Sequence, residues 1–133
     1  MKHTFSICAY GDSPYLEDCI VSLENQAIKS NIIICTSTPS EYISTIAVKH
    51  GINLYIRDGE SSLQADWNYA VETAVNETGA ELVTLAHQDD IYERNYTRAL
   101  SKAVRIYPDM SVFFTRYRTI DKNGKLIDGK ERR

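Results

Sequence analysis

The sequence predicts an α/β fold with a mainly parallel sheet and helices on both of its faces. Strand-like apolar segments alternate four times with segments whose apolar residues recur at helical spacing. The segment Ile32-Ile33-Ile34-Cys35 is a continuous apolar run, which is the pattern of a strand covered on both faces. Both patterns are typical of sheets in which crossover helices connect parallel strands.

The composition agrees with one globular domain, and we expect residues 1–133 to form it. Hydrophobic residues make up 43% and charged residues 25% of the chain, which excludes wholesale disorder. The net charge of -3 disfavours general binding to nucleic acid or anionic membranes. The three cysteines have no CxxC spacing, so they predict free thiols in a reducing cytoplasm rather than a disulfide framework.

Each expected element is marked by its own local pattern. Strands are expected at 5–10, 32–35, 52–56, 81–86 and 111–115, helices behind Ser13, Thr38 and Ser61 and from Tyr92 to Tyr107, and a hairpin turn at Asn123-Gly124 between 118–120 and 125–127. The alternation of the first four strands with the four helices is what predicts parallel pairing.

Capping patterns predict where the helices begin and end. Ser13-Pro14 is a typical N-cap followed by a first helical residue. Residues 38–41 and 61–64 have the capping-box spacing, in which two side chains bond each other's backbone amides. Gly51 and Gly79 follow the last periodic residues of the second and third helices, and glycine is the usual C-terminal stop.

Sheets of this kind bind ligands in the loops at the carboxyl ends of their strands. The loops concerned are 9–13, 35–39, 57–62 and 86–91. The last loop contains Asp89 and Asp90, two adjacent carboxylates that repel each other unless a cation or water screens them. A divalent cation that bridges to phosphate oxygens is one explanation. The other explanation is that one aspartate caps the next helix and the other is solvated.

Several pieces of the chain, in order, resemble family 2 glycosyltransferases with the GT-A fold. The pieces are the strand, loop and helix of 5–26, the second strand at 32–35, Ala65-Asp66-Trp67-Asn68-Tyr69-Ala70, Leu85-Ala86-His87-Gln88-Asp89-Asp90, the strand at 111–115 and the hairpin at 121–125. The fourth of these resembles the strand that ends in the family's DxD motif. The resemblance covers nearly the whole chain, and it implies the Rossmann-like, nucleotide-binding half of a GT-A fold.

The resemblance implies a glycosyltransferase that takes part in polysaccharide biosynthesis. Its donor would be a nucleotide-diphosphate sugar, most of all a UDP-sugar, held with Mn²⁺ or Mg²⁺, and a sugar or glycan would be the acceptor. Nucleotide-sugar contacts are implied for Ala9, Tyr10, Asp12, Ser37, Asp66, Asn68, His87, Gln88 and Asp90, and metal binding for Asp89. For Tyr10, stacking on a base and simple packing both remain open.

Three positions depart from the family pattern. His87 replaces the first acid of the DxD motif, and its imidazole is expected to hydrogen-bond ribose, bind metal or cap the turn. Thr36-Ser37-Thr38 replaces the acidic residues usual after the second strand, so a contact to the base there is expected to be weaker and uncharged. Trp67 stands where a basic residue is frequent, and packing against the sheet is the alternative to a binding role.

The family's general base lies well beyond the DxD motif, whereas this chain ends at Arg133. We therefore expect the chain to be the donor-binding part of a longer GT-A domain, with its catalytic base unknown and no activity by itself. The segment 111–133 is expected to expose apolar surface from Val112, Phe113 or Phe114, or to bury it against another chain by self-association.

The alternative function is a non-catalytic nucleotide-binding or receiver-like signalling module. Receivers carry an acidic pair after the first strand and a phosphate-accepting aspartate after the third. Here the acidic pair follows the fourth strand, and only Asp12 and Asp58 lie near the receiver positions.

No apolar run approaches the roughly 20 residues that span a bilayer, so we expect a cytoplasmic chain, with the full-length protein peripheral at the inner membrane face.

Overall fold

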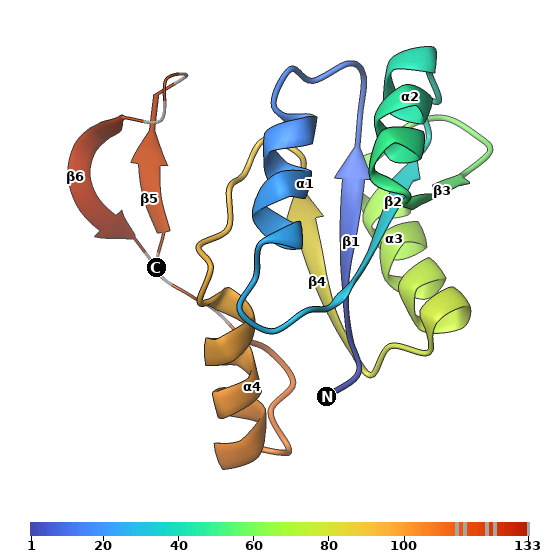
Figure 1. The fold of residues 1–133 in the computed structure, drawn as a ribbon. Helices are drawn as coiled ribbons and strands as arrows, with labels where there is room; N and C mark the ends of the chain where they lie inside the picture. The colour runs from blue at the N-terminus through green and yellow to red at the C-terminus, as the bar shows by residue number, and fades with distance from the viewer. Residues whose placement is uncertain (114, 116, 122, 124, 133) are drawn as a thin grey trace. The chain divides into compact units, whose positions relative to one another are not determined.

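The computed structural model describes residues 1–113, 115, 117–121, 123 and 125–132. The chain divides into two compact units, Met1–Arg98 and Ala99–Arg133, which are described separately below. The first unit contains the sheet and the helices that cover it, and the second contains an antiparallel hairpin (Figure 1). The expectation that the whole chain forms one domain stays a prediction.

The sheet is four-stranded and entirely parallel, which confirms the predicted fold class. Its strands are β1 (His3–Ala9), β2 (Asn31–Thr36), β3 (Asn53–Ile56) and β4 (Leu82–His87), and the helices are α1 (Leu16–Glu24), α2 (Glu41–His50), α3 (Leu63–Thr78) and α4 (Tyr96–Ile106). The strand order is β3-β2-β1-β4, so the chain steps outward from β1 to β3 and then returns to pair β4 with the other side of β1. The order therefore reverses at β1, and ligands bind such sheets at that point.

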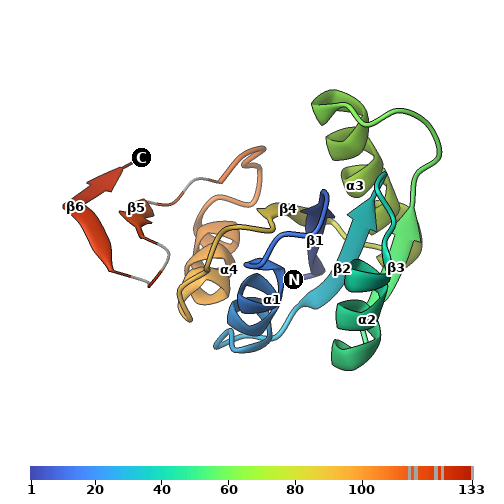
Figure 2. The same cartoon turned by 90° about the horizontal axis from the view of Figure 1, so that it is seen from above.

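Helices cover both faces of the sheet, as the sequence predicted. Figure 2 shows α1 and α2 on one face and α3 on the other. On the first face Phe5 and Ile7 of β1 are buried with Ile20 of α1 and Ile43 of α2. On the second face β2 packs against Ala70 and Ala74 of α3, two small buried residues that let the helix approach the sheet closely.

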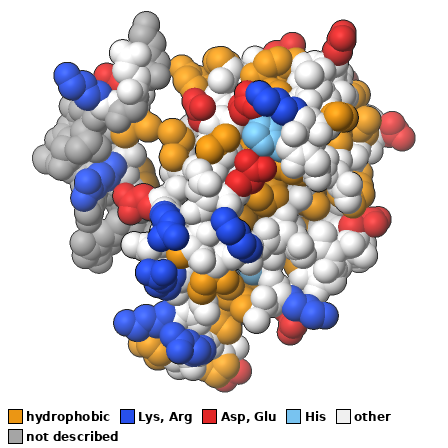
Figure 3. Space-filling model, viewed as in Figure 1, with side chains coloured by type: hydrophobic (Ala, Val, Ile, Leu, Met, Phe, Trp, Pro, Cys, Tyr) orange, Lys and Arg blue, Asp and Glu red, His pale blue; other side chains and the backbone are white. Residues whose placement is uncertain are grey.

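A charge cluster fixes α1 to α2 on the first face. His50 Nε2 lies 2.7 Å from a carboxylate oxygen of Glu17, and His50 Nδ1 lies 3.1 Å from a carboxylate oxygen of Glu24. Lys49 Nζ is 2.8 Å from Glu17 as well, and these bonds hold the pKa of Glu17 below its usual range. In Figure 3 a histidine is visible between acidic and basic side chains over these two helices.

The helices begin later than their capping patterns predicted. The first predicted N-cap is Ser13, but α1 begins at Leu16 and its N-cap position is Tyr15, with no side-chain cap. Ser13 Oγ accepts a hydrogen bond from Tyr15 N at 3.2 Å and donates one to Asp89 at 2.6 Å. The serine hydroxyl thus organises the turn before the helix instead of capping the helix itself.

The predicted caps at Thr38 and Ser61 are displaced as well. Ser40 Oγ caps α2 by accepting from Ile43 N at 3.2 Å, and Ser62 Oγ caps α3 by accepting from Ala65 N at 3.1 Å. The predicted hydroxyls instead bond across loops. Thr38 Oγ1 accepts from Gly11 N at 2.8 Å, and Ser61 Oγ is 2.7 Å from Ser37 Oγ.

The predicted helix ends at two glycines are confirmed. Gly51 and Gly79 follow α2 and α3 with φ of 64° and 69°, the left-handed backbone that favours glycine. The fourth helix, predicted from Tyr92, begins at Tyr96. Tyr92 instead lies with Tyr96 beside Phe5, at ring-centroid distances of 5.0 to 5.7 Å.

The second unit confirms the hairpin and corrects one strand. Strands β5 (Tyr117–Ile120) and β6 (Leu126–Arg132) pair antiparallel, with Ile120 opposite Leu126. The predicted strand at 111–115 is wrong for the described residues 111–113 and 115, which belong to no strand. Apolar, β-branched composition makes a strand only where a partner supplies the ladder of hydrogen bonds, and that pairing begins at Tyr117. Phe114 and Gly124 lie outside the described residues.

None of the helices in the described ranges is long and apolar enough to cross a membrane.

Candidate functional site

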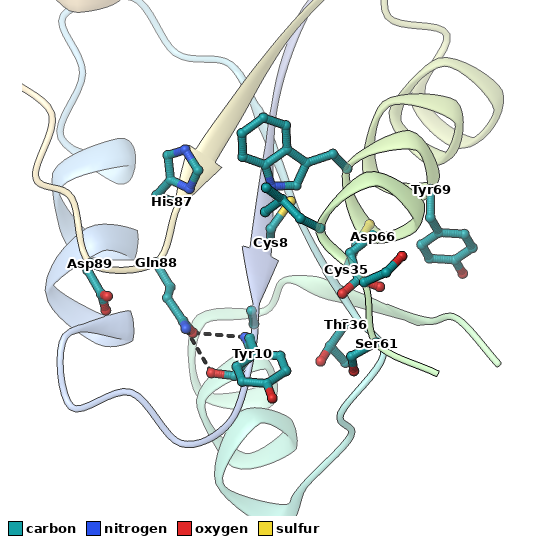
Figure 4. A pocket seen from close by; sticks show the side chains of 14 residues that line it. Cys8, Tyr10, Cys35, Thr36, Ser61, Asp66, Tyr69, His87, Gln88 and Asp89 are labelled. Atoms are coloured by element: carbon teal, nitrogen blue, oxygen red, sulfur yellow. Dashed lines mark hydrogen bonds between the residues drawn. The ribbon is translucent and has the colours of Figure 1, made fainter. Parts of the chain in front are cut away.

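A cavity of about 350 Å³ lies where the strand order reverses. Its walls come from the carboxyl ends of β1, β2 and β4 and from the first turns of α3 (Figure 4). Parallel strands bring these ends together at one edge of the sheet, and the N-terminus of α3 adds its positive dipole end. The cavity is therefore at the place where the fold predicts a ligand.

The structure brings six of the ten predicted site residues to the cavity wall. These are Ala9, Tyr10, Asp66, His87, Gln88 and Asp89. Ser37 does not line the cavity but donates a hydrogen bond to Asp66, at 3.0 Å.

The other three predicted residues lie away from the cavity lining. Asp12 accepts a hydrogen bond from Ser40 Oγ at 2.7 Å, which joins the loop after β1 to the cap of α2. Asn68 and Asp90 are exposed and do not line the cavity. Asn68 follows Asp66 by two residues on α3, so its side chain projects about 200° around the helix from the lining position.

Two hydrogen-bonded ties join the loops that follow β1 and β4. Tyr10 N donates to Gln88 Oε1 at 3.2 Å, and Gln88 Nε2 donates to Tyr10 O at 2.8 Å, as the dashed lines in Figure 4 show. Ser13 Oγ donates to Asp89 Oδ1 at 2.6 Å. Segments 76 or more residues apart in sequence are thus fixed to each other beside the cavity.

A second polar network stands on the opposite wall, around Asp66. Arg57 Nε donates to Asp66 Oδ1 at 3.0 Å, and both side chains are mostly buried, with 18% and 20% exposed. The same guanidinium donates to the backbone oxygens of Asp58 and Glu60 and so folds the loop after β3. Sequence reasoning missed Arg57, although it selected the 57–62 loop, because nothing in the local sequence pairs this arginine with an acid nine residues later.

The two aromatic departures from the family pattern meet in the cavity. The rings of Trp67 and His87 have centroids 5.3 Å apart and planes inclined at 59°. Trp67 comes from α3 and His87 from the end of β4, so the pair spans the cavity wall between a helix and a strand. Packing was the alternative predicted for Trp67, and the ring has this contact while still lining the cavity.

Two cysteines line the cavity, and their thiols are poor nucleophiles. Burial raises the pKa of Cys8 to about 12, with the charges of Cys35 and Asp66 adding to the effect. Burial also raises the pKa of the Cys35 thiol. Since the thiolate is the reactive form, neither residue is suited to covalent chemistry at neutral pH.

Asp89 is the residue of the cavity best placed to bind a cation. The described residues hold no group of three or more His, Cys, Asp or Glu side chains that could cage a metal ion. Asp89 is exposed, and one of its carboxylate oxygens accepts from Ser13 while the other has no hydrogen-bond partner among the described residues. Mg²⁺ commonly binds through one or two carboxylates together with waters and substrate phosphates. The residues thus fit a cation that arrives with a phosphate ligand rather than one held by protein alone.

Comparison with known proteins identifies a fold and no closer relation. No protein-family model matches the sequence, and no curated protein matches it. A crystal structure of residues 1–349 of Staphylococcus aureus TarS, a wall teichoic acid glycosyltransferase, has a TM-score of 0.63 and 12% identity, over 94% of this chain and 43% of that one. A second S. aureus TarS structure has a TM-score of 0.60 and 15% identity, over 80% of this chain and 20% of that one.

The chain therefore spans less than half the length of the TarS chains to which it is similar. At these identities the likeness concerns the fold alone. This chain has the Rossmann-like α/β fold of part of a glycosyltransferase, with the cavity at the carboxyl edge of its parallel sheet.

Proposed function

We propose that this chain is the donor-binding part of a family 2-like glycosyltransferase that binds a nucleotide-diphosphate sugar, a UDP-sugar above all. The single observation that carries the proposal is the cavity at the strand-order reversal, which has an exposed carboxylate at Asp89 and a fixed polar network at Asp66. The glycosyltransferase-like fold supports the same class of ligand.

The two walls of the cavity suit the two ends of a nucleotide diphosphate. The wall at Asp66 and Ser61 offers hydrogen-bond acceptors and hydroxyls, which suit a nucleobase and its ribose. Tyr10 lies at the rim with 63% of its surface exposed, and its ring is available to stack on a base. The wall at Asp89 would hold Mn²⁺ or Mg²⁺ with the diphosphate, and the cation would act as a Lewis acid toward the leaving group.

The residues of the cavity bind and orient, and we infer that the general base lies elsewhere in the complete protein. The cavity has two carboxylates, Asp66 and Asp89, and both already accept hydrogen bonds. Both oxygens of Asp66 are engaged, one by Arg57 and the other by Ser37, so neither is free to take a proton from an acceptor hydroxyl. We therefore expect residues 1–133 to bind donor and to transfer no sugar to an acceptor.

The test is a titration of the chain with a panel of nucleoside diphosphates, with and without Mn²⁺. We expect UDP to raise the melting temperature only when Mn²⁺ or Mg²⁺ is present. At about 100 times Kd the gain in the free energy of unfolding is about 2.7 kcal/mol. The single tryptophan, Trp67, lines the cavity, so its fluorescence gives an independent reading of binding.

The variant Asp89→Asn keeps the shape of the side chain and removes its charge. It should abolish the metal-dependent part of the rise in melting temperature that UDP causes. Asp18→Asn is the matched control, because Asp18 is exposed on α1 and does not line the cavity. Metal-independent binding of equal strength in both variants would contradict the proposal. Transfer of sugar to an acceptor by residues 1–133 alone would also contradict the proposal, because a carboxylate of this chain would then be the general base.

A further inference from the structure

Ser13 makes a short hydrogen bond to the carboxylate that the proposed function assigns to a cation. Ser13 Oγ lies 2.6 Å from Asp89 Oδ1. An ionised carboxylate accepts only, so the serine hydroxyl is the donor. The same hydroxyl accepts from Tyr15 N at 3.2 Å, which leaves its proton for Asp89. The direction of the bond is therefore fixed by the backbone of the turn.

Ser13 is itself held in place by elements that belong to the folded core. Its carbonyl oxygen accepts from Tyr42 Oη at 2.5 Å and from Leu16 N at 3.3 Å. Tyr42 belongs to α2 and packs against the buried cluster of the first sheet face, and Leu16 is fully buried in that cluster. The turn is thus anchored to α1 and α2 together.

Asp89 has no such support of its own. It is exposed, it lies in the loop after β4, and its bond to Ser13 is the one hydrogen bond that its side chain makes among the described residues. A side chain of this kind samples several rotamers unless a partner selects one. The bond uses Oδ1 and leaves Oδ2 for a ligand.

We propose that Ser13 is a positioning residue, which orients the Asp89 carboxylate so that its second oxygen binds a divalent cation together with a diphosphate. This inference rests on the proposed function and deepens it. Hydrogen-bonded partners of metal-binding side chains commonly change metal affinity by 10- to 100-fold when they are removed. A serine in a turn could also serve only the fold, so the test separates metal affinity from stability.

The experiment measures Mn²⁺ binding in the presence of UDP, by the electron paramagnetic resonance signal of free Mn²⁺. We expect Ser13→Ala to raise the Kd for Mn²⁺ about tenfold, and Ser13→Thr, which keeps the hydroxyl, to restore it. Ser44→Ala is the matched control, because Ser44 is exposed on α2 and its hydroxyl has no hydrogen bond within the described ranges. Thermal unfolding of each variant reports the effect on stability separately.

The double variant Ser13→Ala with Asp89→Asn makes the test specific. If Ser13 acts through Asp89, the double variant loses no more Mn²⁺ affinity than Asp89→Asn alone. A loss that adds to that of Asp89→Asn would overturn the inference, because Ser13 would then act through the turn. If Ser13→Ala unfolds, Ser13→Cys, of similar volume and with a weaker donor, takes its place.

The remaining outcomes distinguish the two proposals. Unchanged Mn²⁺ affinity in Ser13→Ala, with a weaker but measurable affinity in Asp89→Asn, would overturn the positioning role and leave the proposed function standing. Failure of the unchanged chain to bind Mn²⁺ with UDP would overturn the proposed function, and the inference with it.

Discussion

Trp67 and His87 each replace a charged residue type that the resemblance leads one to expect, and the structure places their rings in contact. The two rings are 5.3 Å apart between centroids, a distance typical of aromatic pairs. The two rings line the cavity together with the exposed carboxylate of Asp89.

The first prediction ranks the residues of the loop after β4 by their effect on metal-dependent UDP binding. Asp89→Asn should have the largest effect, because it removes the charge nearest the proposed cation. Asp90→Asn should weaken binding less, because Asp90 is exposed and does not line the cavity. His87→Ala should have the smallest effect, since it removes no carboxylate from the site of the proposed metal–diphosphate centre. Calorimetry with Mn²⁺ and UDP measures the order, and a dominant effect of His87→Ala would reverse our assignment.

The second prediction concerns Arg57, which holds both Asp66 and the loop after β3. Arg57→Ala should lower the free energy of unfolding by about 1–3 kcal/mol, because it leaves a mostly buried carboxylate without its charged partner. Arg57→Lys should restore little of the loss, since an ammonium cannot reproduce the forked geometry of the guanidinium. Urea unfolding measures the change, with the exposed Arg94→Ala as control. Equal stability of Arg57→Ala and Arg94→Ala would mean that the ion pair contributes nothing.

At the scale of the element, β1 begins with a buried histidine. His3 is 4% exposed, with its Nδ1 2.8 Å from Ser30 Oγ and its Nε2 2.7 Å from Thr84 Oγ1. Burial lowers the pKa of His3 from 6.5 to about 4, because the charged imidazolium is poorly solvated there. The two hydroxyls satisfy a neutral ring and join β1 to β4 and to the segment before β2.

The third prediction follows from that shift. Between pH 6.5 and about 4 the unfolded chain binds a proton at His3 that the folded chain does not. The contribution of the neutral His3 to the free energy of unfolding is therefore complete above pH 6.5. It is lost as the pH falls toward 4, and the loss amounts to up to about 3 kcal/mol. His3→Gln keeps hydrogen-bonding groups without titrating, so the difference in unfolding free energy between the two proteins should shrink over this range. A difference that does not vary between pH 7 and pH 4 would be inconsistent with a buried neutral histidine.

At the scale of the whole molecule, we predict self-association through the segment that follows α4. Val112 is 63% exposed, an apolar side chain on the described surface of the second unit. The fourth prediction is that sedimentation velocity detects association that grows with protein concentration, and that Val112→Ser weakens it. Val48→Ser, at a valine that is 81% exposed on α2, is the control. A monomer at every concentration would contradict this prediction.

Local sequence patterns predicted the order and type of the elements in the first unit. The apolar run at 32–35, the helical stripes and the two glycines at 51 and 79 each act within a few residues, and the structure confirms them. Parallel pairing followed from the alternation itself, because a crossover helix is what brings parallel strands together. The strand predicted at 111–115 failed for its described residues 111–113 and 115, because an apolar composition makes no strand without a partner and the described pairing begins only at Tyr117.

The sequence by itself therefore determined the α/β class, the edge of the sheet that carries the cavity, and six of the residues that line it. Tertiary structure alone decided what each polar group bonds. The local sequence has the pattern of a helix cap at Ser13, Thr38 and Ser61, yet each of these hydroxyls bonds a group on another loop. Arg57 likewise pairs with Asp66, nine residues later on α3. A hydroxyl or guanidinium bonds whichever partner the fold brings within about 3 Å, and that partner can stand tens of residues away in sequence.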